Sequence, residues 1–303
     1  MTLPAPLRPL CLRRSVLSVP AINRRALEKV HDLDCDAVIF DLEDSVSPDR
    51  KAEARDNLIR FFAETPLKGR ESIIRINAPD TAVGLADLQA VLLCQPDAVL
   101  LPKVDEPQDI MTVVDFLAEQ DAPEQMRIWA MIETPRAILN IAALAESGRT
   151  SGSRLDCFVV GLNDLRKDTH VRDLSGRPYL MPWLMQVVLA ARAYGLDVLD
   201  SVCNDFRDLG AFASECAQGH AMGFDGKMLI HPAQITGANQ CFGPQQAALT
   251  EAQAILAAFA LPEAQGLNVI TVDGRMVERL HLQQAERLVE TARLIAARKE
   301  QQP

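Results

Sequence analysis

The chain has 303 residues, of which 48% are hydrophobic and 24% charged, an ordinary composition for a globular protein with a large core. Its formal net charge of −10 argues against a nucleic-acid-binding protein, because such proteins usually carry a basic face. Apolar runs shorter than about 18 residues argue against a transmembrane helix. The seven cysteines form no C-x-x-C pair, so we expect reduced thiols in a cytoplasmic protein.

The first segment, residues 1–13, contains several prolines and no acidic residue. Proline breaks helices, and the segment lacks the apolar stretch of a secretory signal. We interpret it as a disordered or loosely docked tail, with a transit peptide as the alternative.

From Arg14 onward, short apolar or β-branched runs alternate with amphipathic stretches such as 49–63 and 107–119. Nearly continuous apolar runs are typical of strands buried on both faces. The strand candidates are 15–19, 36–42, 72–77, 97–103, 127–133, 156–162, 197–202 and 226–231. Eight β-then-α units predict an α/β fold, a TIM (β/α)₈ barrel over residues 14–243. A doubly wound open sheet is the alternative, but the chain has no G-x-G-x-x-G turn.

The pattern changes after Pro244, so we treat residues 244–303 as a C-terminal helical extension. A helix is predicted over about 245–260 and a longer one over about 278–299. Between them, Asp273-Gly274 has the composition of a tight turn. We expect this extension to be a lid or an oligomer contact.

Polar side chains follow the predicted barrel strands, at the end where (β/α)₈ enzymes place their chemistry. These residues are Asn23, Asp41, Glu43, Asp44, Arg75, Asn77, Lys103, Glu133, Asn163, Asp164, Lys227 and His231. A cluster of Asp41, Glu43, Glu133 and Asp164 would carry up to four negative charges, and two such charges about 4 Å apart repel by roughly 4 kcal/mol at an effective dielectric of 20. The cluster therefore needs protons, basic partners such as Arg75, Lys103 and Lys51, or a cation. Two protein carboxylates completed by water and substrate are a usual way to hold Mg²⁺.

Helix capping is the competing explanation for the acidic run Phe40–Val46, FDLEDSV. However, Ser47-Pro48-Asp49 already provides a cap, a first-turn proline and a first-turn acid. The upstream carboxylates exceed what capping needs, which favours a functional role. His231, before Pro232, is interpreted as a structural histidine.

At this point the chain resembles the citrate lyase beta subunit and malyl-CoA lyase family, within the HpcH/HpaI aldolase superfamily built on phosphoenolpyruvate/pyruvate-type barrels. The resemblance is carried, in order, by RRSVLSVP, DAVIFDLEDSVSPDRKAEAR, IIRINAP, VLLPKVDEP, MIETPRAI, GLNDL and GFDGKMLIHPAQI. It implies a Mg²⁺-dependent enzyme that makes or breaks a carbon–carbon bond in a β-hydroxy acyl thioester.

Carried over residue by residue, the resemblance implies that Glu133 and Asp164 are the metal ligands. Glu43 and Asp44 would then order water around the metal. Arg75 would bind the carboxylate and carbonyl oxygen of the small 2-keto acid and stabilise oxyanion charge, with Glu133 also facing the substrate.

The resemblance also implies roles for basic residues. Lys51 and Arg55 would neutralise the acidic cluster, and Lys51 would lie beside the substrate. Arg14, in the basic segment around the first strand, would face the thioester carrier. In the extension, Glu278 occupies the position of an aspartate that relatives use as acid/base on a neighbouring subunit, so it is our fourth catalytic candidate with Arg75, Glu43 and Asp44.

Two further departures concern Ala21, where relatives commonly have glycine, and Asn163, where they often have glutamate. The resulting hypothesis is a citramalyl-CoA or malyl-CoA lyase that forms a homotrimer or hexamer. The alternatives are a citrate lyase beta subunit acting on citryl-acyl carrier protein, a synthase or thioesterase using the same site, and a non-catalytic barrel that scaffolds a complex.

Overall fold

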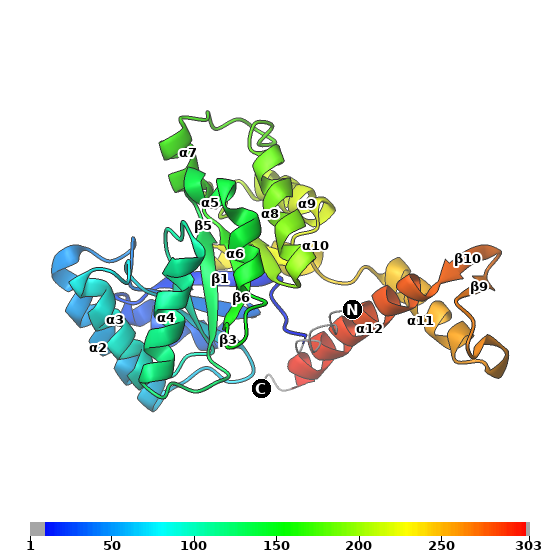
Figure 1. The fold of residues 1–303 in the computed structure, drawn as a ribbon, viewed down its shortest axis with the longest axis horizontal. Coiled ribbons are helices and arrows are strands. Elements are labelled where there is room, and N and C mark those ends of the chain that lie inside the picture. The colour runs from blue at the N-terminus through cyan, green and yellow to red at the C-terminus, as the bar shows by residue number, and fades with distance from the viewer. Residues whose placement is uncertain (1–9, 301–303) are drawn as a thin grey trace. The chain divides into compact units, whose positions relative to one another are not determined.

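The computed structural model describes residues 10–300, so most of the predicted tail lies outside the described part of the chain. Eight parallel strands pair in sequence order and close into a barrel, because β8 pairs with β1. Figure 1 shows the helices arranged around these strands. The strands are β1 (Ser15–Pro20), β2 (Ala37–Asp41), β3 (Glu71–Arg75), β4 (Ala98–Leu101), β5 (Arg127–Ile132), β6 (Leu155–Val160), β7 (Asp197–Asp200) and β8 (Gly226–Leu229). The predicted (β/α)₈ barrel is therefore confirmed.

The helices of the barrel follow the strands and cover their outer face. They are α1 (Arg24–Lys29), α2 (Lys51–Glu64), α3 (Ala82–Cys94), α4 (Pro107–Glu119), α5 (Pro135–Leu139), α6 (Ile141–Ser147), α7 (Leu162–Thr169), α8 (Met181–Tyr194), α9 (Leu209–Met222) and α10 (Ile235–Cys241). In residues 10–300, no helix combines the length and apolar character needed to cross a membrane.

Side-chain alternation produces two cores. One fills the barrel interior with inward-facing residues such as Ile39, Ile73 and Trp129, and the other lies between the strands and helices. The same alternation decides which residues after a strand face the interior. Ala37 and Ile39 point inward, so Asp41 does as well, and its register partner across β2 and β3 is Arg75.

Seven of the eight predicted strands extend one or two residues beyond the carboxyl end of the observed strand. Leu42 and Ile76, for example, are fully buried although they follow the last residues of β2 and β3. Burial continues past the last strand residue because the loops fold over the barrel. An apolar run therefore does not mark where a strand ends.

The amino end of the barrel is closed by Arg13, which is buried and forms ion pairs with Glu71, Asp156 and Asp197. Its guanidinium lies 4.7 Å from the centre of the Trp129 ring. These contacts close the barrel on the side opposite to the carboxyl strand ends.

Residues 13–242 form one compact unit, and the chain from Gly243 onward belongs to a second. The second unit contains α11 (Gln246–Phe259), a hairpin of β9 (Val269–Val272) and β10 (Arg275–Glu278), and α12 (Arg279–Glu300). Asp273 and Gly274 have φ angles of 47° and 77°. Both are left-handed, as a two-residue hairpin turn requires, which confirms the predicted tight turn.

Candidate active site

A pocket of about 330 Å³ opens at the carboxyl ends of the barrel strands. Its polar wall includes Asp41, Asp44, Arg75, Glu133 and Asp164, all predicted from the sequence. The wall also contains apolar residues, namely Met131, Val160, Leu162, Val202, Met228 and Ile230. The strand-end carboxylates thus converge on one cavity.

Asp41 holds both Arg75 and its own loop. Its two oxygens accept hydrogen bonds from Arg75 Nε and Nη2, each at 2.7 Å, and from the backbone amides of Glu43 and Ser45. Burial favours a higher pKa, but the guanidinium and these hydrogen bonds outweigh it and keep the pKa of Asp41 below its ordinary value. Both oxygens of Asp41 are therefore engaged in holding Arg75 and the loop that follows β2.

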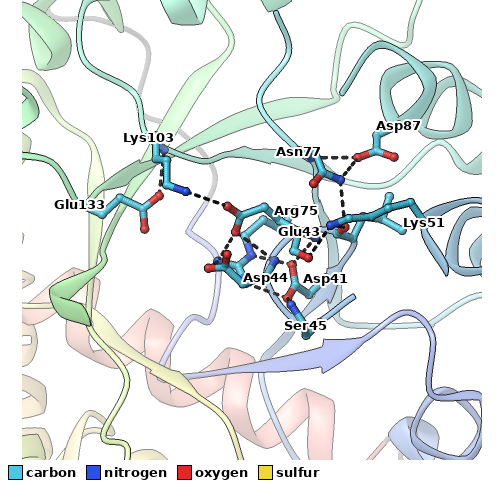
Figure 2. Close-up of polar contacts among 11 residues, drawn as sticks. Asp41, Glu43, Asp44, Ser45, Lys51, Arg75, Asn77, Asp87, Lys103 and Glu133 are labelled. Carbon is cyan, nitrogen blue, oxygen red and sulfur yellow. Dashed lines mark hydrogen bonds and ion pairs between the residues drawn. The ribbon is translucent and has the colours of Figure 1, made fainter. Parts of the chain in front are cut away.

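Glu43 and Asp44 approach the same guanidinium from the following loop, as Figure 2 shows. Arg75 Nη1 lies 3.0 Å from Glu43 Oε2 and 3.6 Å from Asp44 Oδ2. The second oxygen of Glu43 lies 3.4 Å from Lys103 Nζ. Burial, together with Asp44 and Asp41, raises the pKa of Glu43, and the two cations oppose this only in part. Negative charge in this loop therefore exceeds what the cations balance.

Glu133 follows β5 and is 2% exposed. Its Oε1 accepts a hydrogen bond of 2.8 Å from the Lys103 amide, and Lys103 has a left-handed φ of 49° that is unusual for a lysine. Burial first, and then the charges of Glu43 and Asp164, raise the pKa of Glu133 to about 7. The loop after β4 thus adopts an uncommon backbone conformation where it meets this carboxylate.

Gly161 gives Glu133 its space. A Cβ at position 161 would lie 2.5 Å from Glu133 Oε2, closer than real contacts allow. The glycine ends the apolar run of β6 and precedes Asp164, which stands in the first turn of α7. Beside it, Asn163 and Asn204 exchange side-chain hydrogen bonds of 3.2 and 2.7 Å.

The donor set suits a hard divalent cation. Once Asp41 and Arg75 are paired, four carboxylates remain around Lys103, and three of these, Asp44, Glu133 and Asp164, line the pocket. Glu133 and Asp164 follow the neighbouring strands β5 and β6. Within residues 10–300, no three His, Cys, Asp or Glu side chains are arranged to hold a metal. Two carboxylates completed by water and substrate therefore remain the fitting arrangement, as Mg²⁺ prefers.

The structure corrects the predicted roles of Lys51 and Arg55. Lys51 Nζ donates to the backbone carbonyls of Leu42 and Glu43, at 2.8 and 2.7 Å, and not to carboxylates in the pocket. Arg55 pairs instead with Asp87. Both residues project from α2, which runs beside the acidic loop, so they reach its backbone and the neighbouring α3.

Asp87 was not predicted, because it lies in the middle of α3 with no strand-end signal. It is completely buried and accepts hydrogen bonds from Arg55 and from the backbone and side chain of Asn77. The Asn77 amide also donates to the Leu42 carbonyl, so Asn77 and Lys51 hold the same backbone oxygen (Figure 2). We call Lys51, Asn77 and Asp87 the loop clamp.

Arg14 is also misplaced in the prediction. It precedes β1 and forms a two-oxygen pair with buried Asp36, which precedes β2. Residues before parallel strands lie at the amino end of the barrel, so Arg14 cannot line a pocket at the carboxyl end. Ser47 precedes a 3-10 helix, Pro48–Arg50, but its side chain makes no capping hydrogen bond, so the first-turn proline and the first-turn acid, Asp49, are confirmed and the Ser47 cap is not.

Two other candidates lie away from the pocket wall. Lys227 points outward from β8 to Asp200 and Glu215. His231 Nδ1 caps the turn Pro232–Gln234, the structural role we predicted for it, and its ring stacks on Phe206.

Glu278 is the last residue of β10 in the second unit, where its backbone amide donates a hydrogen bond to His281 Nδ1. The pocket also includes Ser201 and Asn204, which the sequence did not indicate.

Residues 14–232 match the model of the HpcH/HpaI aldolase/citrate lyase family. The chain is 42% identical to a (3S)-malyl-CoA thioesterase of Cereibacter sphaeroides, over 94% of this chain and 96% of the relative. It is 30% identical to the human mitochondrial citramalyl-CoA lyase, over 92% and 85%. A crystal structure of CitE from Mycobacterium tuberculosis in complex with magnesium, acetoacetate and coenzyme A is similar with a TM-score of 0.72 and 28% identity, over 92% and 97%.

Proposed function

The chain belongs to the HpcH/HpaI aldolase/citrate lyase family, and from this premise we propose that it is a Mg²⁺-dependent lyase acting on a β-hydroxy acyl-CoA. The products are a 2-keto acid and acetyl-CoA. The observation that carries the proposal is the pairing of Glu133 and Asp164 on one pocket wall with Arg75 beside them. The likeness to a CitE structure holding magnesium and coenzyme A supports the same cofactor and carrier.

In this proposal Glu133 and Asp164 would hold the Mg²⁺, which would supply Lewis-acid polarisation and a template for the keto acid. Arg75 lies where it can bind the carboxylate and carbonyl oxygen of that acid, and its guanidinium stabilises oxyanion charge. Glu43 and Asp44 would order water around the metal. The chemistry needs no covalent nucleophile from the chain.

Cleavage begins when a base removes the proton of the β-hydroxyl group. The carbon–carbon bond then breaks, its electrons pass to the thioester as an enolate, and protonation of the enolate gives acetyl-CoA. We assign the acid/base role to Glu278, supplied to the pocket of a second copy in a homotrimer or hexamer. A Glu278→Gln variant with normal turnover would contradict this assignment.

The pocket favours keto acids with a single carboxylate. Its lining contains one cation, Arg75, and Asp41 already holds that cation, while Met131, Met228, Val202 and Ile230 form an apolar wall. The second carboxylate of oxaloacetate would meet this wall or the acidic loop without a charge partner. We therefore propose citramalyl-CoA or malyl-CoA as the substrate, ahead of a citryl thioester on CoA or on an acyl carrier protein.

A thioesterase is the second candidate, favoured by the 42% identity to a (3S)-malyl-CoA thioesterase. Hydrolysis would break the carbon–sulfur bond, releasing a free thiol and the intact hydroxy acid. The lyase reaction leaves the thioester intact and releases a keto acid. The two reactions therefore differ in their products, whichever residues they share.

The test is a panel of malyl-CoA, citramalyl-CoA and citryl-CoA with the purified chain, with and without Mg²⁺, measuring keto acid and free thiol in parallel. We expect keto acid from the first two substrates, only with Mg²⁺, and none from Glu133→Ala or Asp164→Ala. Thiol without keto acid would establish the thioesterase instead. Activity confined to citryl-acyl carrier protein would favour a citrate lyase subunit, and no turnover of any substrate would favour a scaffold.

A further inference from the structure

A buried ion network lies outside the barrel, between β7, β8 and the helices that cover them. Asp200, at the end of β7, is completely buried and accepts hydrogen bonds from Lys227 Nζ at 2.9 Å and from Arg177 Nη1 at 2.7 Å. Lys227 is also completely buried, and its Nζ donates a second hydrogen bond, of 3.2 Å, to Glu215 Oε2. Gly219 lets α9 pass close by, since a Cβ there would lie 2.9 Å from Asp200 Oδ2.

The network is connected to the pocket through one residue. Asp200 Oδ1 also accepts a hydrogen bond of 2.9 Å from the backbone amide of Ser201, which fixes the orientation of that residue. Ser201 is 1% exposed and lines the pocket. Its Oγ accepts a hydrogen bond of 3.0 Å from the backbone amide of Leu162, the first residue of α7.

This last contact supplies something that α7 lacks. The residue before α7 is Gly161, which has no side chain to cap the helix, and the first amides of a helix have no partner within it. Gly161 cannot be replaced by a capping serine or aspartate, because any Cβ there would collide with Glu133. The cap therefore comes from Ser201, on a different strand.

The position of this cap matters because α7 carries Asp164 in its first turn. We infer that Ser201 is a positioning residue for Asp164: held by the Asp200–Lys227–Arg177 network, it fixes the start of α7 relative to β7. The inference rests on the proposed role of Asp164 as a Mg²⁺ ligand. Partners that orient a metal ligand commonly change metal affinity by about 10- to 100-fold when they are removed.

The experiment measures Mg²⁺ binding to metal-free protein by calorimetry, without substrate, for Ser201→Ala and Ser201→Cys. Cysteine keeps most of the volume but is a poor acceptor, so it covers the case in which the alanine variant does not fold. We expect both variants to bind Mg²⁺ about tenfold more weakly. Hydrogen exchange of the metal-free protein should also show the Leu162 amide exchanging about fivefold faster, as for a lost helix cap.

Thr81→Ala is the matched control, because Thr81 caps α3 through the Gly84 amide, is exposed, and does not line the pocket. It should speed exchange at the start of α3 and leave Mg²⁺ affinity unchanged. Suppose that Asp164→Asn abolishes binding while both Ser201 variants bind Mg²⁺ within twofold of the parent. That result would overturn the inference about Ser201 and leave the proposed metal role of Asp164 intact. Undiminished binding in Asp164→Asn would overturn the metal assignment, while the exchange rate at Leu162 still decides whether Ser201 is the cap.

Discussion

Arg75 and Asp41 face each other across β2 and β3 as register partners, and the guanidinium holds both carboxylate oxygens at 2.7 Å. Both side chains are buried, at 9% and 1% exposure. The pair fixes the plane of the guanidinium, so the Nη1 edge faces Glu43 and Asp44. Asp41 therefore determines how Arg75 is presented to the pocket.

We expect Asp41→Asn to lower the free energy of unfolding by about 3 kcal/mol, because the substitution removes the charged acceptor of two buried hydrogen bonds from Arg75, and Glu43 pairs only with the Nη1 edge of the guanidinium. Turnover should fall by about 100-fold or more, since the guanidinium loses its fixed orientation. Urea unfolding and steady-state kinetics measure the two effects. Glu53→Gln is the control, because the Arg50–Glu53 pair is exposed and should contribute less than about 0.5 kcal/mol. Equal losses in the two variants would contradict this account.

Glu133 should make the metal-free protein less stable as the pH rises. Its pKa is raised to about 7 in the folded chain, against about 4.3 when unfolded, so the folded state holds the extra proton between those values. Stability from this group is present at low pH and is lost as the pH passes through 7. The loss approaches about 3 kcal/mol.

Glu133→Gln removes that penalty. In EDTA, urea unfolding should show the variant about equal to the parent near pH 4 and more stable by about 3 kcal/mol at pH 8. Glu53→Gln is the control, because Glu53 is exposed and lies outside the pocket, so its loss should change the pH dependence little. Parallel pH profiles for Glu133→Gln and the parent would show that Glu133 ionises normally.

The sequence predicted the barrel and most of the pocket wall because both follow from short-range patterns. The carboxyl ends of apolar runs indicated Asp41, Arg75, Glu133 and Asp164. Strand ends were less predictable, because Leu42 and Ile76 stay buried beyond the last strand residue.

The sequence could not show which group each charged side chain binds. Lys51 and Arg55 stand one helical turn apart, near the acidic run, yet one binds carbonyls and the other binds Asp87. These partners depend on how α2 packs against α3, and no local sequence pattern predicts that packing. Arg14 was assigned to the wrong end of the barrel because its role was carried over from the resemblance alone, although it precedes the first predicted strand and therefore lies at the amino end. Gly161 did carry a signal, as a glycine directly after an apolar run and before a candidate ligand.

Gly161→Ala should disable the site while leaving the fold intact. The new Cβ would lie 2.5 Å from Glu133 Cβ and Oε2, so the carboxylate must move. We expect Mg²⁺ affinity to fall by about tenfold or more, measured by calorimetry. Gly210→Ala in α9 is the control, since its nearest contact is an ordinary 3.4 Å and alanine favours helix. Unchanged Mg²⁺ affinity in Gly161→Ala would show that Glu133 is not a ligand of the metal.

The loop clamp should act as a unit. Lys51 and Asn77 donate to the same Leu42 carbonyl, so removing one changes what the other contributes. We expect Lys51→Met to cost about 1–2 kcal/mol and Asn77→Ala a similar amount. The double variant should depart from additivity by about 0.5 kcal/mol or more, measured by urea unfolding.

Arg70 provides the comparison for this cycle. It makes the same kind of contact, donating to the carbonyls of Val30 and Leu33, but it precedes β3 whereas Asn77 follows it. Arg70→Met and Asn77→Ala should therefore add within about 0.5 kcal/mol. If the loop clamp presents Glu43 and Arg75 to the substrate, the Lys51 and Asn77 variants should also lose turnover while Arg70→Met keeps it. If the losses in the free energy of unfolding for the Lys51 and Asn77 variants are additive and both variants keep normal turnover, the two contacts are independent and the loop clamp is not a unit.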